Sequence, residues 1–197
     1  DWSSDVCSSD LANSYAADLT WRNAPLEITT TLFHSVLTNP QVYRPLDRGP
    51  YAAAIVNAEI PTRNTGAELI GRYHEEHTDI VVTYMHLRSA EVAEEGVGRR
   101  DVPLNPRHTA SFDLLQSMGP AAVGFEVYYT GTQALEDNPY RSVSRPYVIW
   151  GLLYTHRVGP ALIYVNTEDL GDVRQTKFDP LLRPLPLRDG RWATDAW

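Results

Sequence analysis

The chain has 197 residues, and 17 basic against 25 acidic side chains give it a formal net charge of −8 at pH 7. This mildly acidic balance disfavours a nucleic-acid partner, which requires a basic surface. One cysteine is present, so a disulfide within the chain and a cysteine-based metal site are excluded. No apolar run reaches the roughly 18 residues of a transmembrane helix, and the sequence predicts none in this stretch.

The first eleven residues are set aside before the fold is considered. Residues 1–11 match the translation of a common sequencing-library adapter, so we expect them to be artefactual and residues 12–197 to be the natural part. Removing Asp1, Asp5 and Asp10 changes the formal charge from −8 to −5, and removing Cys7 leaves no thiol. Because the reading frame is expected to be cut at this point, the lack of a signal peptide carries no information.

Alternation of apolar and polar residues is the dominant pattern. Successive side chains of a β-strand point to opposite faces, so an apolar residue at every second position gives the strand one apolar face and one polar face. Three segments show the pattern most clearly, with the apolar sets Tyr15, Ala17, Leu19 and Trp21; His108, Ala110, Phe112 and Leu114; and Val123, Phe125, Val127 and Tyr129.

Eight strands are predicted from this alternation and from the turn residues between segments. They cover residues 14–22, 26–36, 53–74, 79–88, 106–116, 121–130, 147–156 and 161–168. The third is too long for one strand, and we expect Pro61 and Gly66 to mark where it bends and, if the strands span a membrane, where it leaves the bilayer.

The links between these strands alternate in length. Short links at residues 23–25, 75–78, 117–120 and 157–160 alternate with long polar links at 37–52, 89–105 and 131–146 and after 169. Transmembrane β-barrels of the outer membrane have short periplasmic turns and long extracellular loops. The pattern predicts an all-β fold, a segment of an antiparallel up-and-down transmembrane β-barrel with about eight strands, open because it is truncated.

Several stretches resemble one known family. They are residues 56–58, 62–69 with Gly66-Ala67-Glu68, 102–110 with Pro103-Leu104-Asn105-Pro106, 124–131, and 164–175 with Asp169-Leu170-Gly171-Asp172. Together, in this order and spacing, they resemble the C-terminal barrel of TonB-dependent outer-membrane receptors. The resemblance covers nearly everything after Leu11.

The resemblance implies a function and a location. Such a receptor lies in the bacterial outer membrane and takes up a scarce nutrient (siderophore-iron, haem, a vitamin or a glycan) with energy supplied by TonB. Its partners would be outer-membrane lipid, lipopolysaccharide, TonB through an N-terminal region, and a small-molecule ligand. No enzyme activity, cofactor or metal is implied. The family's plug domain, its energy-coupling box and its last strand are absent from this stretch, so we expect residues 12–197 to be a partial barrel.

Aromatic residues near the strand ends are expected at the membrane interfaces. A ring with a polar edge is favoured at the level of the lipid headgroups. The residues predicted to form these girdles are Tyr15, Trp21, Tyr73, Tyr84, Tyr147, Trp150 and Tyr154.

Two long loops contain aromatic and charged residues that could contact a ligand. On the first they are Tyr43, Arg48 and Tyr51, together with Arg44 and Asp47; on the third they are Tyr140 and Arg141, together with Glu136 and Asp137. The alternative is that these residues rigidify the loops or meet surface lipopolysaccharide.

Other polar motifs are interpreted as structural. His74-Glu75-Glu76-His77 spaces its histidines at i and i+3 in a predicted turn, whereas a zinc protease needs i and i+4 on a helix. Asp113, Glu126 and Glu68 lie on polar faces, and we expect them to pair with Arg72 or Arg107 rather than to act as an acid and base. No Gly-x-Ser-x-Gly elbow occurs, so the sequence predicts no catalytic residues.

Two alternatives to the receptor remain at the level of sequence. A soluble antiparallel β-sandwich, such as a carbohydrate-binding or secreted-enzyme domain, also has short alternating strands, but buries its apolar faces against each other. An unplugged porin-like channel would share the barrel wall and lack the plug.

Overall fold

The computed structural model describes residues 11–45, 53–93, 98–136, 138, 140–174, 177, 182–186 and 192–194. The described part is built from strands, and no helix in it could cross a membrane. The strands are β1 (Leu11–Asn23), β2 (Leu26–Thr38), β3 (Gln41–Pro45), β4 (Ala53–Asn57), β5 (Thr62–Glu75), β6 (Thr78–Val92), β7 (Arg99–Asp101), β8 (His108–Met118), β9 (Ala121–Thr130), β10 (Tyr147–Val158), β11 (Ala161–Thr167), β12 (Leu182–Pro186) and β13 (Trp192–Thr194).

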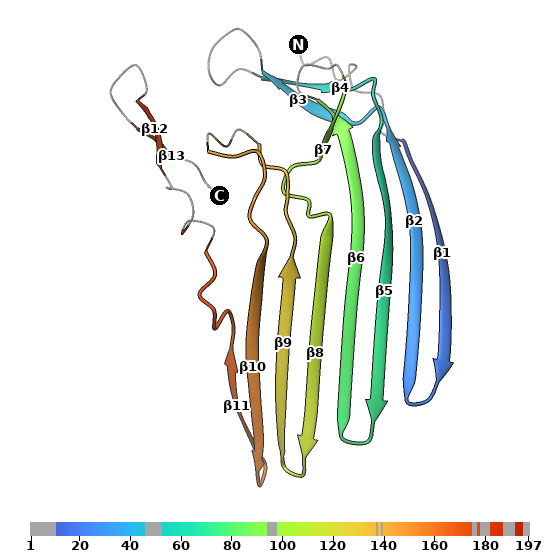
Figure 1. The fold of residues 1–197 in the computed structure, drawn as a ribbon, viewed down its shortest axis with the longest axis vertical. Coiled ribbons are helices and arrows are strands. Elements are labelled where there is room, and N and C mark those ends of the chain that lie inside the picture. The colour runs from blue at the N-terminus through green and yellow to red at the C-terminus, as the bar shows by residue number, and fades with distance from the viewer. Residues whose placement is uncertain are drawn as a thin grey trace.

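One antiparallel sheet dominates the molecule (Figure 1). Its strands follow the order β1-β2-β5-β6-β8-β9-β10-β11, and the short β7 pairs with the upper part of β6. Tight turns join the strands two by two at one end, the turn end, whereas the long connections all lie at the other, the loop end. Among the described residues, β1 and β11 each pair on one side only, so the sheet is open.

The eight predicted strands correspond to the eight strands of this order, with one difference. The overlong third segment is two strands, because the chain leaves the sheet at residues 58–61 and β4 pairs with β3 in a separate hairpin. Pro61 lies in this break, as expected. The prediction for Gly66 is wrong: it lies inside β5, where its missing side chain makes room for Phe33 on β2.

The sheet is staggered, as a barrel wall is. A row of directly opposite residues starts close to the turn end of β1 and climbs to the upper half of β10, passing through Trp21, Ile28, Gly71, Val82, Phe112, Val127 and Trp150. Strands must be displaced and tilted in this way for a sheet to close into a barrel. The same row shows that β1, β2, β5, β6, β8, β9 and β10 each contribute to one apolar face.

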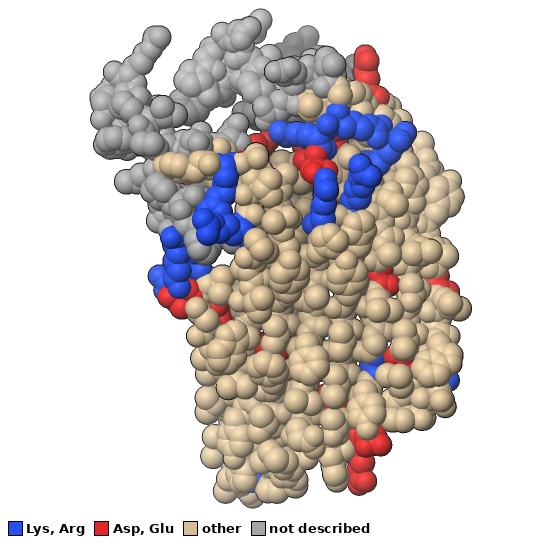
Figure 2. Space-filling model, viewed as in Figure 1, with Lys and Arg blue, Asp and Glu red and all other residues tan. Residues whose placement is uncertain are grey.

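The two faces of the sheet differ in chemistry. On the apolar face, uncharged side chains form a broad band between the turn end and the loop end (Figure 2). The opposite face, the polar face, includes Asp18, Thr31, Glu68, Thr109 and Thr130 in one row across the sheet, which Met85 of β6 interrupts. Val123, Phe125, Val127 and Tyr129 of β9 lie on the apolar face and Glu126 and Tyr128 on the polar face, so the alternation predicted for this segment is confirmed.

Nothing among the described residues covers the apolar face. Leu19 is 75% exposed and Tyr15 70%, and no large side chain is fully buried. Ala58 and Val92 are the only buried apolar residues described, and both lie near the loop end. The β-sandwich alternative is wrong, because a sandwich requires a second layer packed on this face.

Gly66 provides a test of the wall's packing. A Cβ at Gly66 would lie 2.5 Å from the backbone oxygen of His86 and closer still to the ring of Phe33, whereas a Cβ at Gly71 on the same strand meets nothing within 4 Å. We expect Gly66→Ala to lower the free energy of unfolding by about 1–3 kcal/mol. Gly71→Ala, the matched control, should leave it unchanged or raise it slightly. Urea unfolding in lipid vesicles measures both, and equal effects would contradict the close contact.

Candidate functional site

Short hydrogen bonds between neighbouring strands line the polar face. The Thr31 hydroxyl donates to Asp18 over 2.6 Å, and Thr83 and Ser111 share a hydrogen bond of 2.9 Å. Towards the middle of the sheet, the Tyr128 hydroxyl lies 3.3 Å from both the Asp113 and the Glu126 carboxylates. These groups form a fixed polar surface of hydroxyls and carboxylates.

The carboxylates on this face do not pair with arginine as predicted. Arg72 binds Asp79 at 2.7 Å, and Arg107 binds Asp101 at 2.6 Å. Asp113 and Glu126 lie directly opposite each other, and Val81 separates Asp113 from Arg72 in the same row. The register of the sheet therefore prevents the expected contact.

At the turn end, the His74-Glu75-Glu76-His77 stretch forms the tight connection between β5 and β6. The His74 ring lies 3.0 Å from the Asp79 carboxylate, which also binds Arg72. No group of three or more His, Cys, Asp or Glu side chains suited to a metal ion occurs in the part of the chain that the structure describes. The stretch is a polar turn.

A cavity of about 240 Å³ opens at the loop end, where the upper part of β6 meets two loops. Its lining includes Leu87 and Ser89 of β6, the Asp101–Arg107 ion pair, and Gln133 and Val143 of the loop after β9. The backbone N–H of Leu104 donates to the oxygen of Ala134 over 2.9 Å and ties the two loops together. The cavity is mixed in character, with both charges and apolar walls.

The predicted ligand contacts of the loops are only partly visible. Tyr43 belongs to β3, but its side chain, Arg48 and Tyr51 lie outside what the structure describes. Tyr140 and Arg141 are described, and the Asn138 side chain accepts hydrogen bonds from their backbone N–H groups at 2.8 and 3.2 Å. Neither lines the cavity, although Val143 of the same loop does. Ligand contact by these residues stays a prediction.

The cavity itself was not foreseen from the sequence. Arg107 and Asp101 are six residues apart and separated by two prolines, and nothing in their spacing indicates that they face Gln133. Pairing of β7 with β6 brings Asp101 opposite Ala90, and the Asp101 carboxylate lies 2.6 Å from Arg107. The residues that line the cavity can therefore be identified only when the pairing of the strands is known.

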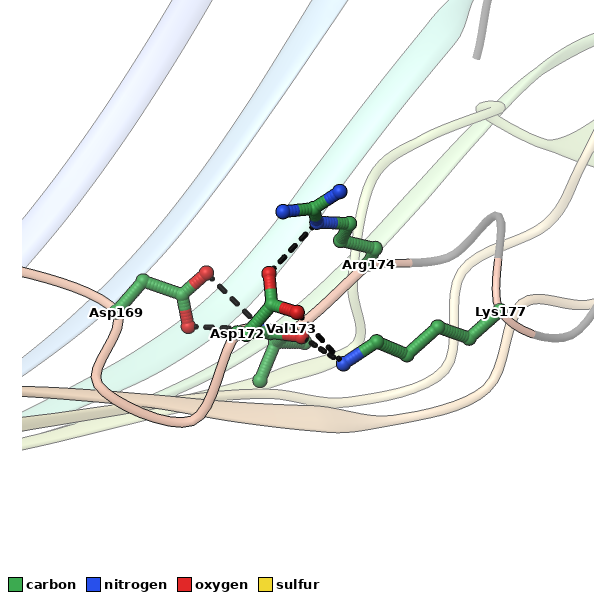
Figure 3. Close-up of polar contacts among 5 residues, drawn as sticks. All are labelled: Asp169, Asp172, Val173, Arg174 and Lys177. Atoms are coloured by element: carbon green, nitrogen blue, oxygen red, sulfur yellow. Dashed lines mark hydrogen bonds and ion pairs between the residues drawn. The ribbon is translucent and has the colours of Figure 1, made fainter.

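The loop after β11 is held by its own acidic residues (Figure 3). The Asp169 carboxylate accepts the backbone N–H of Val173, with both oxygens 3.0 Å away. The Asp172 carboxylate binds Arg174 at 2.6 Å and Lys177 at 3.3 Å. The loop also docks on β10, because the N–H of Leu170 donates to the backbone oxygen of Trp150 over 3.0 Å.

The predicted interfacial aromatics occupy two levels of the sheet. Trp21, Tyr73 and Tyr154 lie two to four residues from the turn end of their strands, and Tyr15, Tyr84 and Trp150 lie six to eight residues from it. All six lie on the apolar face. Tyr147 does not fit this role, because it lies opposite Thr130 on the polar face. Whether the two levels match lipid interfaces stays a prediction.

An antiparallel, staggered, single-layered sheet with one apolar and one polar face is a section of a β-barrel wall. Comparisons with solved structures support the assignment of a barrel wall. No protein-family model and no curated protein matches the sequence. Solved structures that it resembles include the ferric yersiniabactin uptake receptor FyuA from Yersinia pestis (TM-score 0.67, 17% identity, covering 83% of this chain and 25% of that one).

Two further structures give the same result. The FrpB iron transporter from Neisseria meningitidis matches with a TM-score of 0.67 and 12% identity, over 84% of this chain and 28% of that one. The copper transporter OprC matches with a TM-score of 0.67 and 14% identity, over 86% and 27%. Many of the matching structures are TonB-dependent outer-membrane receptors, and this chain has the fold of part of their barrel. It spans about a quarter of their length.

The loop after β11 can be tested through Asp169. Replacing its carboxylate with the methyl group of alanine removes the acceptor for Val173, at a cost of about 1 kcal/mol. We expect Asp169→Ala to increase trypsin cleavage after Arg174 about fivefold. Asp169→Asn keeps an acceptor oxygen and tolerates the positive φ of 46° at this position, so it should cleave like the original protein. Equal cleavage of both variants would contradict the assigned contact.

The ion cluster of the same loop predicts a pH dependence. Lys177 and then Arg174 lower the pKa of Asp172 below its ordinary value. A lowered pKa in the folded state means that the cluster stabilises the loop above the ordinary pKa of an aspartate and loses this effect as the pH falls through the folded pKa. NMR titration of the carboxyl group should give a midpoint below that of an unfolded peptide. Lys177→Gln should raise the midpoint, whereas Glu168→Gln should not.

Proposed function

We propose that this chain forms part of the barrel wall of an outer-membrane receptor that takes up a scarce nutrient with energy supplied by TonB. The observation that carries the proposal is the single-layered sheet with an uncovered apolar face, which matches part of such barrels over more than 80% of this chain. The proposal includes the bacterial outer membrane as the location.

The physical chemistry of the sheet supports a lipid environment. A continuous apolar face of this size is stable against acyl chains and unstable in water. In a bilayer the unpaired backbone groups along β1 and β11 need partners, since each unsatisfied group costs several kcal/mol. We therefore propose that further strands of the whole protein continue the wall from both edges. The plug and the segment that contacts TonB would lie elsewhere in the whole protein.

The polar face and the loop end would face the cargo. The cavity with Arg107 and Asp101 opens at the end with the long connections, which in outer-membrane barrels is extracellular. The similar proteins are named for different cargoes, ferric yersiniabactin for FyuA and copper for OprC. Siderophore-iron, haem, a vitamin or a glycan are all compatible with a wall of this kind.

Transport rather than catalysis fits the groups that are described. The similar structures named above are transporters and receptors. On the polar face, Asp113 and Glu126 hold the Tyr128 hydroxyl, which gives each of them a structural role. In this proposal no bond of the cargo is broken, and lipopolysaccharide surrounds the barrel on its outer side.

Uptake by the complete protein tests the proposal. The full-length gene is expressed in a bacterium that lacks its own iron receptors, and radioactive iron is supplied as a panel of siderophores, with haem, vitamin B12 and glycans tested in parallel. We expect one cargo to accumulate in the strain with TonB and not in an otherwise identical strain without it. Uptake that does not depend on TonB would instead support the unplugged porin-like channel. No uptake of any cargo would contradict the receptor.

A further inference from the structure

Two histidines lie side by side on the apolar face, away from the polar face and its carboxylates. His86 is in the upper half of β6, and His108, the first residue of β8, lies directly opposite it. His86 shares its face with Val82, because the two are four positions apart on one strand. Both histidines are exposed, and the centroids of their rings are 5.0 Å apart, with 48° between the ring planes.

The backbone ladder brings these two side chains as close as an antiparallel sheet allows. The N–H of Leu87 donates to the backbone oxygen of Arg107 over 2.9 Å, so Leu87 and Arg107 form a hydrogen-bonded pair. Such pairs alternate along the ladder with non-hydrogen-bonded pairs, whose Cα atoms are only about 4.5 Å apart and whose side chains lie closer. His86 and His108 form the next pair and therefore have the closer spacing.

The distance between the rings suits one metal ion held between them. A zinc ion lies about 2.0–2.1 Å from an imidazole nitrogen, and so about 3.2 Å from the centre of the ring. Two rings on one ion then have their centres about 5.2 Å apart at the tetrahedral angle and about 4.5 Å apart at a right angle. The observed 5.0 Å falls within this range, nearer to the tetrahedral value.

Tyr84 determines which nitrogen of His108 is available to an ion. The Tyr84 hydroxyl lies 2.7 Å from Nδ1 of His108, and the two rings are stacked. When Nδ1 donates its proton to such a partner, Nε2 keeps its lone pair for a metal and the ring is held in one orientation. The His86 ring has no hydrogen bond with any group that the structure describes, so either of its nitrogens can bind.

Small residues flank the pair on both sides. Ala67 lies opposite His86 on β5, and Gly131 follows β9 beside His108, where a Cβ would be 3.3 Å from the Cβ of His108. Water can therefore occupy the remaining positions around an ion. Arg88 lies two positions from His86 on the same face, and its positive charge opposes the binding of a cation. The two imidazoles must supply the affinity.

We propose that His86 and His108 bind one divalent transition-metal ion of the kind that prefers imidazole, with Zn²⁺ the best match to the ring spacing. The ion links β6 to β8 and closes the stretch of chain between the two histidines, part of which lines the cavity. The site lies on the apolar face, whereas the proposed function assigns the cargo to the polar face. The ion is therefore a component of the wall and not the cargo.

Zinc titration of the complete protein, without a histidine tag and in detergent, tests this site. Isothermal titration calorimetry with Zn²⁺ alone gives the affinity and the number of ions bound. We expect His86→Ala and His108→Ala each to weaken one zinc site by about a hundredfold, because a single imidazole loses the advantage of two linked ligands. The double variant should weaken it little further, since both rings act on the same ion. Excess Mg²⁺ should not displace the zinc, because Mg²⁺ prefers oxygen ligands.

His156→Ala is the matched control. His156 lies on the apolar face near the turn end and contacts Tyr154 through its Nδ1 at 3.4 Å, but its partner across the ladder is Ala121. It therefore has the tyrosine contact without a second histidine, and its replacement should leave zinc binding unchanged. The proposal is overturned if His86→Ala and His108→Ala bind zinc like the original protein, or if His156→Ala loses the site to the same extent.

Two variants that keep both histidines separate the roles of the neighbours. Tyr84→Phe removes the partner of Nδ1 and should weaken zinc binding about tenfold. Arg88→Gln removes the opposing charge and should strengthen it severalfold. These variants replace the alanine variants if circular dichroism shows that those have lost their strand content, and unchanged zinc affinity in both would then overturn the site.

Nutrient uptake is scored separately from zinc binding. If uptake fails while the zinc site is present, the receptor falls and the metal site stands. If uptake succeeds and the zinc site is absent, the metal site falls alone.

Discussion

The pleat of the β-strand is the constraint on which the structure depends. It sends successive side chains to opposite faces, and the register of the hydrogen-bonded ladder carries this division from each strand to the next. From β1 to β10 the apolar set remains on one face, as the row from Trp21 to Trp150 shows. The described residues form no second layer. The wall is therefore stabilised by the backbone hydrogen bonds between its strands, by side-chain contacts between neighbouring strands and by the environment of its apolar face.

The two ends of the sheet differ in the length of their connections and in their contacts. At the turn end the connections are short, and ion pairs such as Arg22 with Glu27 and Arg72 with Asp79 hold neighbouring strands together. At the loop end the chain has room for an extra hairpin, a short strand beside β6 and a loop that docks on Trp150. The features that could recognise other molecules are gathered at this second end.

At the loop end the two faces present different chemistry at the same height. The cavity is lined by Leu87 and Ser89, which lie on the polar face, and by Asp101, which lies opposite Ala90 on the apolar face and balances the positive charge of Arg107. The apolar face carries Arg63, Arg88 and Arg99 at this end, above a band of uncharged side chains.

The sequence by itself determined most of the wall. Alternation and turn residues located its eight strands, because each strand must match the period of the pleat wherever one face is apolar. The same local rule failed for Tyr147, since β10 carries apolar residues at both sets of positions and only its pairing with β9 assigns the faces. It also failed for Gly66, whose role depends on Phe33 of another strand.

Only the tertiary structure decided which polar groups meet. The carboxylates of Asp113 and Glu126 lie opposite each other, and both contact the Tyr128 hydroxyl. Neither pairs with Arg72, because the strand register places Val81 between Arg72 and Asp113. Likewise, the cavity joins residues from β6, β7 and two loops. The physical reason is that faces follow from a period of two within a strand, whereas contacts follow from the register between strands, which depends on the whole sheet.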